Sequence, residues 1–141
     1  MSQTGLKVFD RTVQDTNEWL GELETNLHSE DRRRAYISLR SVLQALRDRL
    51  PPAEAVQLGA QLPMLLRGMY YEGWTAKGKP IKADREEFLE RVAEGIVTSG
   101  PVDPVREAQA VFAVLARKIS SGEIQDVTGS LPPGLRELWP D

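Results

Sequence analysis

Residues 62–74, LPMLLRGMYYEGW, and residues 131–139, LPPGLRELW, share the pattern Leu-Pro-x-x-Leu-Arg, and each continues to aromatic side chains. Pro63 and Pro132 each interrupt a helical pattern and restart it, because proline lacks a backbone N–H and suits the first turn of a helix. The occurrence of this sequence pattern twice in one chain indicates a duplicated helical unit rather than two active sites.

The two prolines lie 69 residues apart, and this offset also aligns the segments that precede them without a gap. The aligned apolar pairs include Leu23 with Val92, Leu27 with Ile96, Val42 with Val111, Leu46 with Leu115, Leu58 with Val127 and Leu66 with Leu135. Any two amphipathic helices can be slid into partial agreement, but a gap-free match over four segments favours duplication. Since a half of this size buries too little apolar surface to be stable alone, we expect two halves sharing one core about an approximate two-fold axis.

Apolar residues recur with the 3.6-residue period of helices, and no segment alternates convincingly as a strand would. The expected helices are 10–27, 29–50, 52–61, 63–71, 84–98, 103–119 and 121–128, followed by a short turn at 135–139. Asp84, in capping-box spacing with Glu87, and Asp103, directly before Pro104, are the expected N-caps of the fifth and sixth helices.

The predicted fold is therefore all-α, with two tandem repeats of about four helices each and seven to eight helices in total. The chain is expected to form a single domain over residues 1–141, with repeat halves at about 10–74 and 84–141. The segment GWTAKGKPIKA is rich in Gly, Lys and Pro, so residues 75–83 are predicted to be an exposed linker.

Composition excludes several function classes. The 141 residues are 40% hydrophobic and 28% charged, which is typical of a soluble globular protein. The absence of cysteine excludes disulfides, thiolate metal sites and thiol nucleophiles. No run of apolar residues is as long as the core of a signal peptide or a membrane span, so we expect a cytoplasmic protein without membrane contact. The net charge of −3 argues mildly against nucleic acid as the main partner.

Residues 39–74, LRSVLQALRDRLPPAEAVQLGAQLPMLLRGMYYEGW, resemble the signature of the bacterial family called domain of unknown function 2267 (DUF2267). Residues 111–139 resemble the degenerate second copy in that family. The resemblance runs from Trp19 to Trp139 and is most specific between Leu50 and Trp74, where two proline breaks and the aromatic residues come together. It implies an all-helical fold and a small cytoplasmic bacterial protein. It implies no reaction, since the name of the family records that none is assigned.

Motifs for catalysis are lacking. The glycines form neither a dinucleotide-binding loop nor a P-loop, and no G-x-S-x-G elbow occurs. His28 is the sole histidine, which argues against a zinc site and against a hydrolytic triad. The acidic run between Asp84 and Glu94 is interpreted as the solvated face of a helix. We therefore expect no enzyme, no cofactor and no catalytic or metal-binding residue.

Aromatic residues and arginines near the two Leu-Pro-x-x-Leu-Arg segments are the candidate partner-binding residues, since these types are enriched at interfaces. The candidates are Tyr71, Trp74, Arg67 and Arg136. Tyr70 and Trp139 are expected in the core, whereas core and surface are equally favoured for Tyr71 and Trp74. The arginines occupy equivalent places, as do Glu54 and Glu123. Binding of each arginine to its own half's glutamate or to free helix carbonyls is favoured over a symmetric anion site.

Arg32, Arg33 and Arg34 form the strongest basic cluster and are the candidate nucleic-acid residues. The leading hypothesis is a non-enzymatic interaction or regulatory module whose partner, a protein, lies in a groove or against an aromatic patch between the repeats. A nucleic-acid-associated protein is the alternative, and a small-molecule enzyme is the least favoured. The sequence does not predict an oligomeric state.

Overall fold

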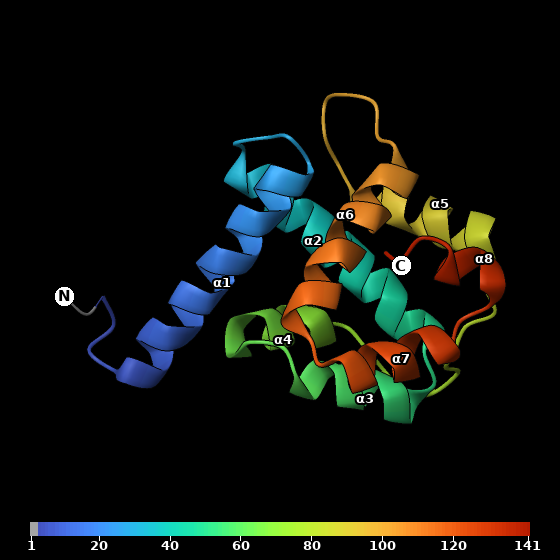
Figure 1. Ribbon diagram of the computed structural model, residues 1–141, viewed down its shortest axis with the longest axis horizontal. Helices are drawn as coiled ribbons and strands as arrows, with labels where there is room; N and C mark the ends of the chain where they lie inside the picture. Colours follow the sequence, from blue (N-terminus) through green and yellow to red (C-terminus); the bar gives the residue numbers. More distant parts are fainter. Residues whose placement is uncertain (1–2) are drawn as a thin grey trace.

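The computed structural model describes residues 3–141, which form eight α-helices and no strand (Figure 1). The helices are α1 (Lys7–Asn26), α2 (Arg32–Arg49), α3 (Pro52–Ala60), α4 (Met64–Tyr71), α5 (Arg85–Gly95), α6 (Pro104–Lys118), α7 (Ser121–Gly129) and α8 (Pro133–Arg136). The expected all-α class is therefore confirmed.

Local chemistry sets most helix boundaries. The side chains of Asp84 and Asp103 cap α5 and α6 by accepting hydrogen bonds from the backbone N–H three residues later, as expected. The expected start of the first helix near Asp10 is wrong, because α1 begins at Lys7. Asp10 does not cap the helix; its carboxylate accepts from the Thr4 hydroxyl at 2.7 Å, and Leu6 precedes the helix without a side-chain cap.

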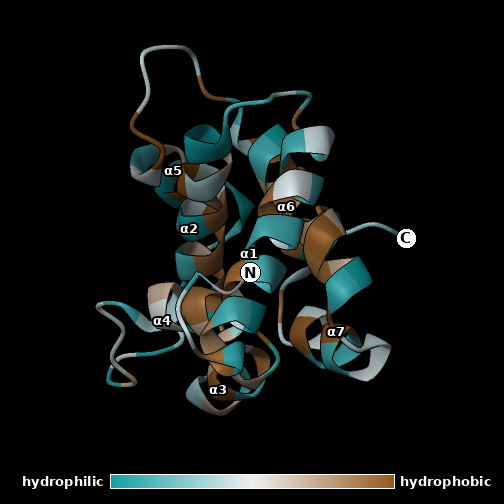
Figure 2. Ribbon diagram, turned by 90° about the vertical axis from the view of Figure 1, so that its left-hand side faces the viewer, coloured by the Kyte–Doolittle hydropathy of each residue, from teal (hydrophilic) through white to brown (hydrophobic). Residues whose placement is uncertain are grey.

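One apolar core receives buried side chains from all eight helices. Helix α2 lies at its centre and packs against α1, α3, α4, α5 and α6 (Figure 1). The hydropathy colouring shows hydrophobic residues interleaved with hydrophilic ones along these helices, as amphipathic packing requires (Figure 2). The core thus joins segments from both ends of the chain.

Helices α3 and α7 pack against each other although 69 residues separate them. Both start and both end at positions that differ by this same offset, and so do the last residues of α2 and α6. At their junction Gln61 and Ser120 bond reciprocally: the Gln61 amide donates to the Ser120 hydroxyl at 3.1 Å and accepts from the Ser120 N–H at 3.0 Å.

The segment between α4 and α5 has no helix, as expected for a linker, but its second half is anchored to α2. The N–H of Ile81 donates to the carbonyl of Asp48 at 2.9 Å, and Arg49 donates to the carbonyl of Ala83 at 2.9 Å. Ala83 is buried, so the linker is exposed only in part.

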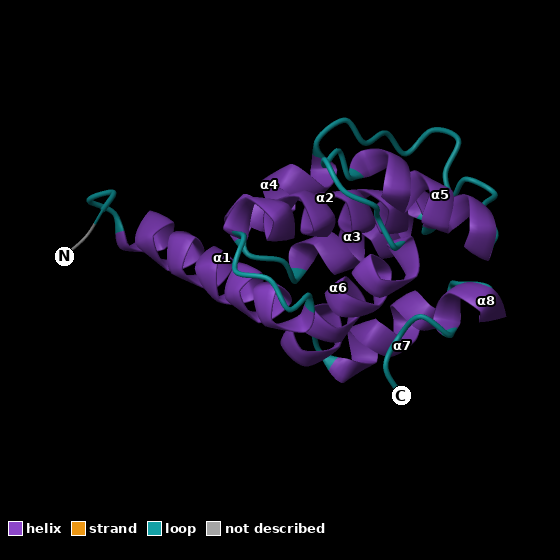
Figure 3. Ribbon diagram, turned by 90° about the horizontal axis from the view of Figure 1, so that it is seen from above, coloured by secondary structure: helices purple, strands orange, loops and turns teal. Residues whose placement is uncertain are grey.

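Helix α1 extends beyond the body of the molecule at its N-terminal end (Figure 3). It has 20 residues, whereas α5, its counterpart in the 69-residue register, has 11. At a rise of about 1.5 Å per residue, the additional residues lengthen the helix by roughly 13 Å.

Candidate functional site

Arg67 and Arg136 bind backbone carbonyls at or just after the ends of α3 and α7. The Arg67 guanidinium donates to the carbonyls of Gly59, Ala60 and Leu62 at 2.9–3.2 Å. Arg136 donates to the carbonyl of Leu131 at 2.9 Å. For Arg67 this is one of the two structural roles expected from the sequence, because the last carbonyls of a helix lack intrahelical donors. The acceptor of Arg136 lies two residues after the end of α7. Neither arginine forms an ion pair with a glutamate among residues 3–141.

The aromatic residues of the segment 62–74 divide between core and surface. Tyr70 is fully buried and its hydroxyl donates to the carbonyl of Ala55 at 2.7 Å. Tyr71 and Trp74 are half-buried, lie 5.7 Å apart between ring centroids and pack against the core. A Cβ at Gly59 would collide with the Tyr71 hydroxyl, so the close approach of α3 to this ring requires glycine. Tyr71 and Trp74 therefore offer only a partly open face.

The basic cluster is largely engaged within the molecule. Arg32 forms an ion pair with Glu24 at 2.7 Å. Arg34 forms an ion pair with the buried Glu107 and a hydrogen bond to Ser38. Arg33 is exposed. Two of the three guanidinium groups are thus held by α1 and α6, which leaves less free positive charge for phosphate contacts than the sequence suggests.

An open groove of about 600 Å³ lies between α2 and α5. Its lining is polar and mixed in charge: it includes Arg40 and Arg91 as well as Glu87, Glu90 and Glu94. None of the predicted partner-binding residues lines this groove. The structure therefore does not bring Tyr71, Trp74 and the two arginines together there.

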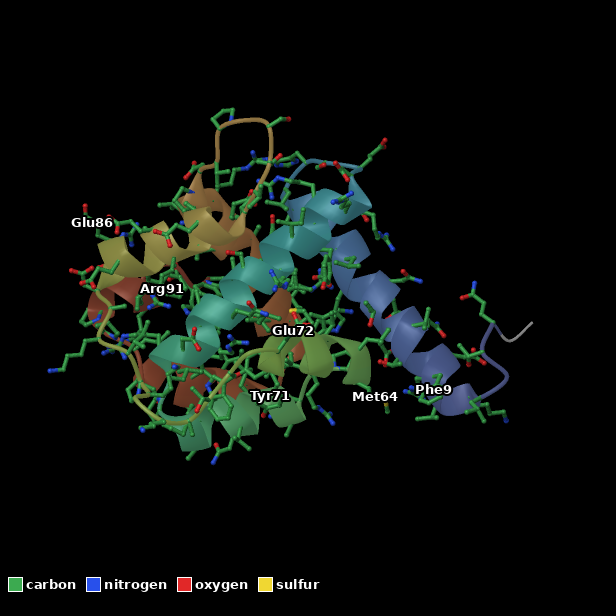
Figure 4. The ribbon with its side chains drawn as sticks, turned by 180° about the vertical axis from the view of Figure 1, so that it is seen from behind. Phe9, Met64, Tyr71, Glu72, Glu86 and Arg91 are labelled. Atoms are coloured by element: carbon green, nitrogen blue, oxygen red, sulfur yellow. The ribbon has the colours of Figure 1, made fainter. Side chains whose placement is uncertain are left out.

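Exposed apolar side chains gather where α1 passes the start of α4. Val8, Phe9, Met64 and Leu65 are 43–55% exposed, and we call these four residues the apolar edge. The Thr12 hydroxyl accepts from the N–H of Leu65 at 3.0 Å and so joins the two helices there. Figure 4 shows Phe9 and Met64 at the same end of the molecule.

The apolar edge continues the buried stripe of α1. Thr12, Trp19, Leu20 and Leu23 face the core, and helical spacing places Val8 and Phe9 on this same side, one turn before Thr12. Those two side chains are exposed, and Figure 3 shows that α1 extends past the body of the molecule at this end. The sequence analysis missed this surface, although the periodicity of α1 up to Val8 was the available signal.

Apart from Asp10, whose carboxylate binds Thr4, the charged side chains on the outer flank of α1 are separated along the helix. Lys7 and Arg11 lie in its first turns, and Asp15 and Glu18 follow in the next turns. None of these four side chains forms an ion pair within the part of the chain that the structure describes. This end of α1 therefore presents both an apolar face and uncompensated charges.

Two carboxyl groups that the sequence analysis did not connect face each other between α3 and α7. Glu54 and Glu123 lie in the first turns of their helices, where an acidic side chain is favoured by the helix dipole. Glu123 is only 6% exposed. One carboxylate oxygen of each is buried without a hydrogen-bond donor. Burial, the facing Glu54 carboxyl and Asp126 raise the pKa of Glu123 to about 8.

This pair predicts that stability falls as the pH rises. Between an ordinary carboxyl pKa of 4.5 and about 8, folded Glu123 holds a proton that the unfolded chain has lost. The free energy of unfolding should therefore decrease across this window and level off above it. Urea unfolding at a series of pH values, in the presence of a chelator, measures how steeply the free energy of unfolding changes with pH. Glu123→Gln should flatten it, and an unchanged slope in this variant would contradict the prediction.

The fold and these surfaces define a class of small all-helical proteins with one core common to eight helices over residues 3–141. Within this class, the chain belongs to the family described as "Uncharacterized conserved protein (DUF2267)", whose model matches residues 16–138. The match confirms the resemblance of the sequence. Curated proteins give no match to the chain. Among residues 3–141, no helix is both long and apolar enough to cross a membrane.

Proposed function

We propose that this protein is a non-enzymatic interaction module that docks through the apolar edge, and that the occupant of this edge is a second copy of the chain. The observation that carries the proposal is the continuation of the α1 stripe into Val8 and Phe9, which are exposed at the same end of the molecule as Met64. Contiguous exposed apolar side chains typically mark interaction surfaces.

The proposal includes the duplication of the chain as two tandem repeats around one core. Two observations support the duplication. Helices α3 and α7 differ by the same offset at both ends. Arg67 binds the carbonyl of Leu62, and Arg136 binds the equivalent carbonyl of Leu131. In this view the first half of α1 is an addition, since α5 has no corresponding residues. A segment that only one repeat carries is a natural place for a function that the core does not need.

Charge complementarity favours a second copy as the occupant. Helical spacing places Val8 next to Arg11 and Asp15 on the surface of α1. In an antiparallel pair of copies, the cationic first turns of one flank can therefore lie against the anionic turns of the other, beside Val8. Self-complementary surfaces of this kind are what a two-fold interface requires. Exposed charge pairs contribute more to specificity than to affinity, so the apolar edge would supply most of the binding energy.

Sedimentation velocity tests the proposal. The wild-type chain should form a dimer whose fraction rises with concentration, and Phe9→Glu should raise the dissociation constant at least about tenfold because it buries a charge in the interface. The matched control is Val97→Glu, since Val97 is 82% exposed in the loop between α5 and α6. This control should leave the dimer unchanged.

Charge reversal separates a second copy from another partner. Arg11→Glu and Asp15→Arg should each weaken the dimer, and the double variant should restore it. A wild-type chain that stays monomeric up to its solubility limit would overturn self-association. A dimer that Phe9→Glu leaves intact would overturn the docking role of the apolar edge.

A further inference from the structure

Three carboxylates converge beside the junction of α3 and α7. Glu54, Glu123 and Asp126 each offer one oxygen, and these oxygens lie within 4.8 Å of one another. Glu54 comes from α3, and the other two come from successive turns of α7. Oxygens at such separations can contact a single ion, since cation–oxygen distances of about 2.1–2.5 Å are usual for hard divalent metals.

Glu123 is the independent sign of a ligand. Its side chain is more than nine-tenths buried, its Oε2 has no hydrogen-bond donor among the described residues, and one of its oxygens lies within 4.8 Å of the other two carboxylates. Oε1 of Glu54 is also buried without a partner. A buried carboxylate oxygen normally has a hydrogen bond, an ion pair or a metal, because its desolvation is costly. Apart from a proton on Glu123, no group among the described residues compensates these two oxygens.

The basic side chains of the neighbouring helices do not compensate the charge. On the helices that pack against α3 and α7, arginines and lysines bind elsewhere. Arg47 donates to the carbonyls of Tyr70 and Glu72, Arg49 to Ala83, Arg67 to α3 carbonyls, and Arg117 and Lys118 pair with Glu22. Within residues 3–141, no ion pair includes any of the three carboxylates.

We propose that Glu54, Glu123 and Asp126 bind one hard divalent cation, such as Ca²⁺, Mg²⁺ or Mn²⁺, which joins α3 to α7. An all-carboxylate set favours these ions over zinc or copper, which prefer nitrogen and sulfur ligands. Asp126 is exposed, so the ion can enter from solvent and complete its coordination with water. The cation supplies the positive charge that the neighbouring helices lack.

The ion would act as a structural link. Gln61 and Ser120 already connect the same two helices by hydrogen bonds. The proposed site adds a second connection between segments 69 residues apart. It is distinct from the apolar edge, so its test does not depend on self-association.

Calorimetric titration and thermal unfolding test the proposal on the full chain, first treated with a chelator. Titration with CaCl₂, MgCl₂ or MnCl₂ at constant ionic strength should show one equivalent bound for at least one of the three ions. A saturating concentration of that ion should raise the Tm by about 3 °C or more, because a ligand that binds only the folded state stabilises it.

Isosteric variants show whether these residues hold the ion. Glu123→Gln and Asp126→Asn should each abolish the bound equivalent and the rise in Tm, whereas Glu90→Gln on the exposed face of α5 should retain both. Asp126→Asn keeps the test decisive if Glu123→Gln fails to fold, since Asp126 is exposed. Absence of binding for all three ions would overturn the proposal. It would mean that a proton, and no metal ion, lies between Glu54 and Glu123. Binding that survives Asp126→Asn would overturn it as well.

Discussion

Phe112→Ala is expected to lower the free energy of unfolding by about 3–5 kcal/mol, the largest effect of any single substitution considered. Phe112 lies on α6 and is fully buried. Its ring stacks on Trp139 with centroids 4.1 Å apart and an interplanar angle of 6°, and it lies 6.1 Å from Phe88. Truncation therefore removes contacts to α5 and to the end of the chain at once, and it leaves a cavity between them.

Urea unfolding followed by circular dichroism measures this loss. Tyr36→Ala is the matched control, because it removes an aromatic ring from a side chain that is 40% exposed and lies outside the apolar edge. We expect the control to change stability much less, as surface substitutions usually do. A loss below about 1 kcal/mol for Phe112→Ala would contradict the packing described for α5, α6 and the C-terminal residues.

Glu107→Ala is expected to lower the free energy of unfolding by about 3 kcal/mol. Glu107 is 5% exposed on α6 and forms an ion pair with Arg34 of α2, and the Ser38 hydroxyl donates to its other oxygen at 3.3 Å. Removing one partner of a buried pair costs about 3–5 kcal/mol, because the other charge stays desolvated. The Arg34 side chain is 20% exposed, so we expect the lower end of this range.

A double-mutant cycle with Arg34→Ala isolates the interaction. The double variant should be less destabilised than the sum of the single variants, since no unpaired charge remains. Glu90→Ala, on the exposed face of α5, is the control for loss of a glutamate from a helix. Additive effects in the cycle would show that Arg34 and Glu107 are energetically independent and would contradict the prediction.

Much of the fold could be predicted from short-range signals. Pro51, Pro63, Asp84 and Asp103 mark helix boundaries because proline geometry and side-chain caps act within a few residues. The start of α1 could not be predicted in this way, since Leu6 supplies no capping side chain and the carboxylate of Asp10 binds Thr4 instead.

The candidate sites depend on tertiary arrangement and were harder to predict. The binding of Arg67 to carbonyls follows from the chemistry of helix ends and was expected. The meeting of Glu54 with Glu123 requires the packing of α3 on α7, which no local pattern contains. The apolar edge depends on where the body ends along α1, so the exposure of Phe9 could not be read from its periodicity alone.

The central place of α2 has a consequence for the synthesis of the chain. Leu39, Val42 and Leu43 on α2 are fully buried, and α5 and α6, which are made later, pack against this helix. During translation the first four helices emerge before α5 and α6, the helices that cover the remaining apolar surface of α2. A nascent chain of this protein therefore carries exposed apolar surface until most of its length has left the ribosome, a state in which chaperones commonly protect a growing polypeptide.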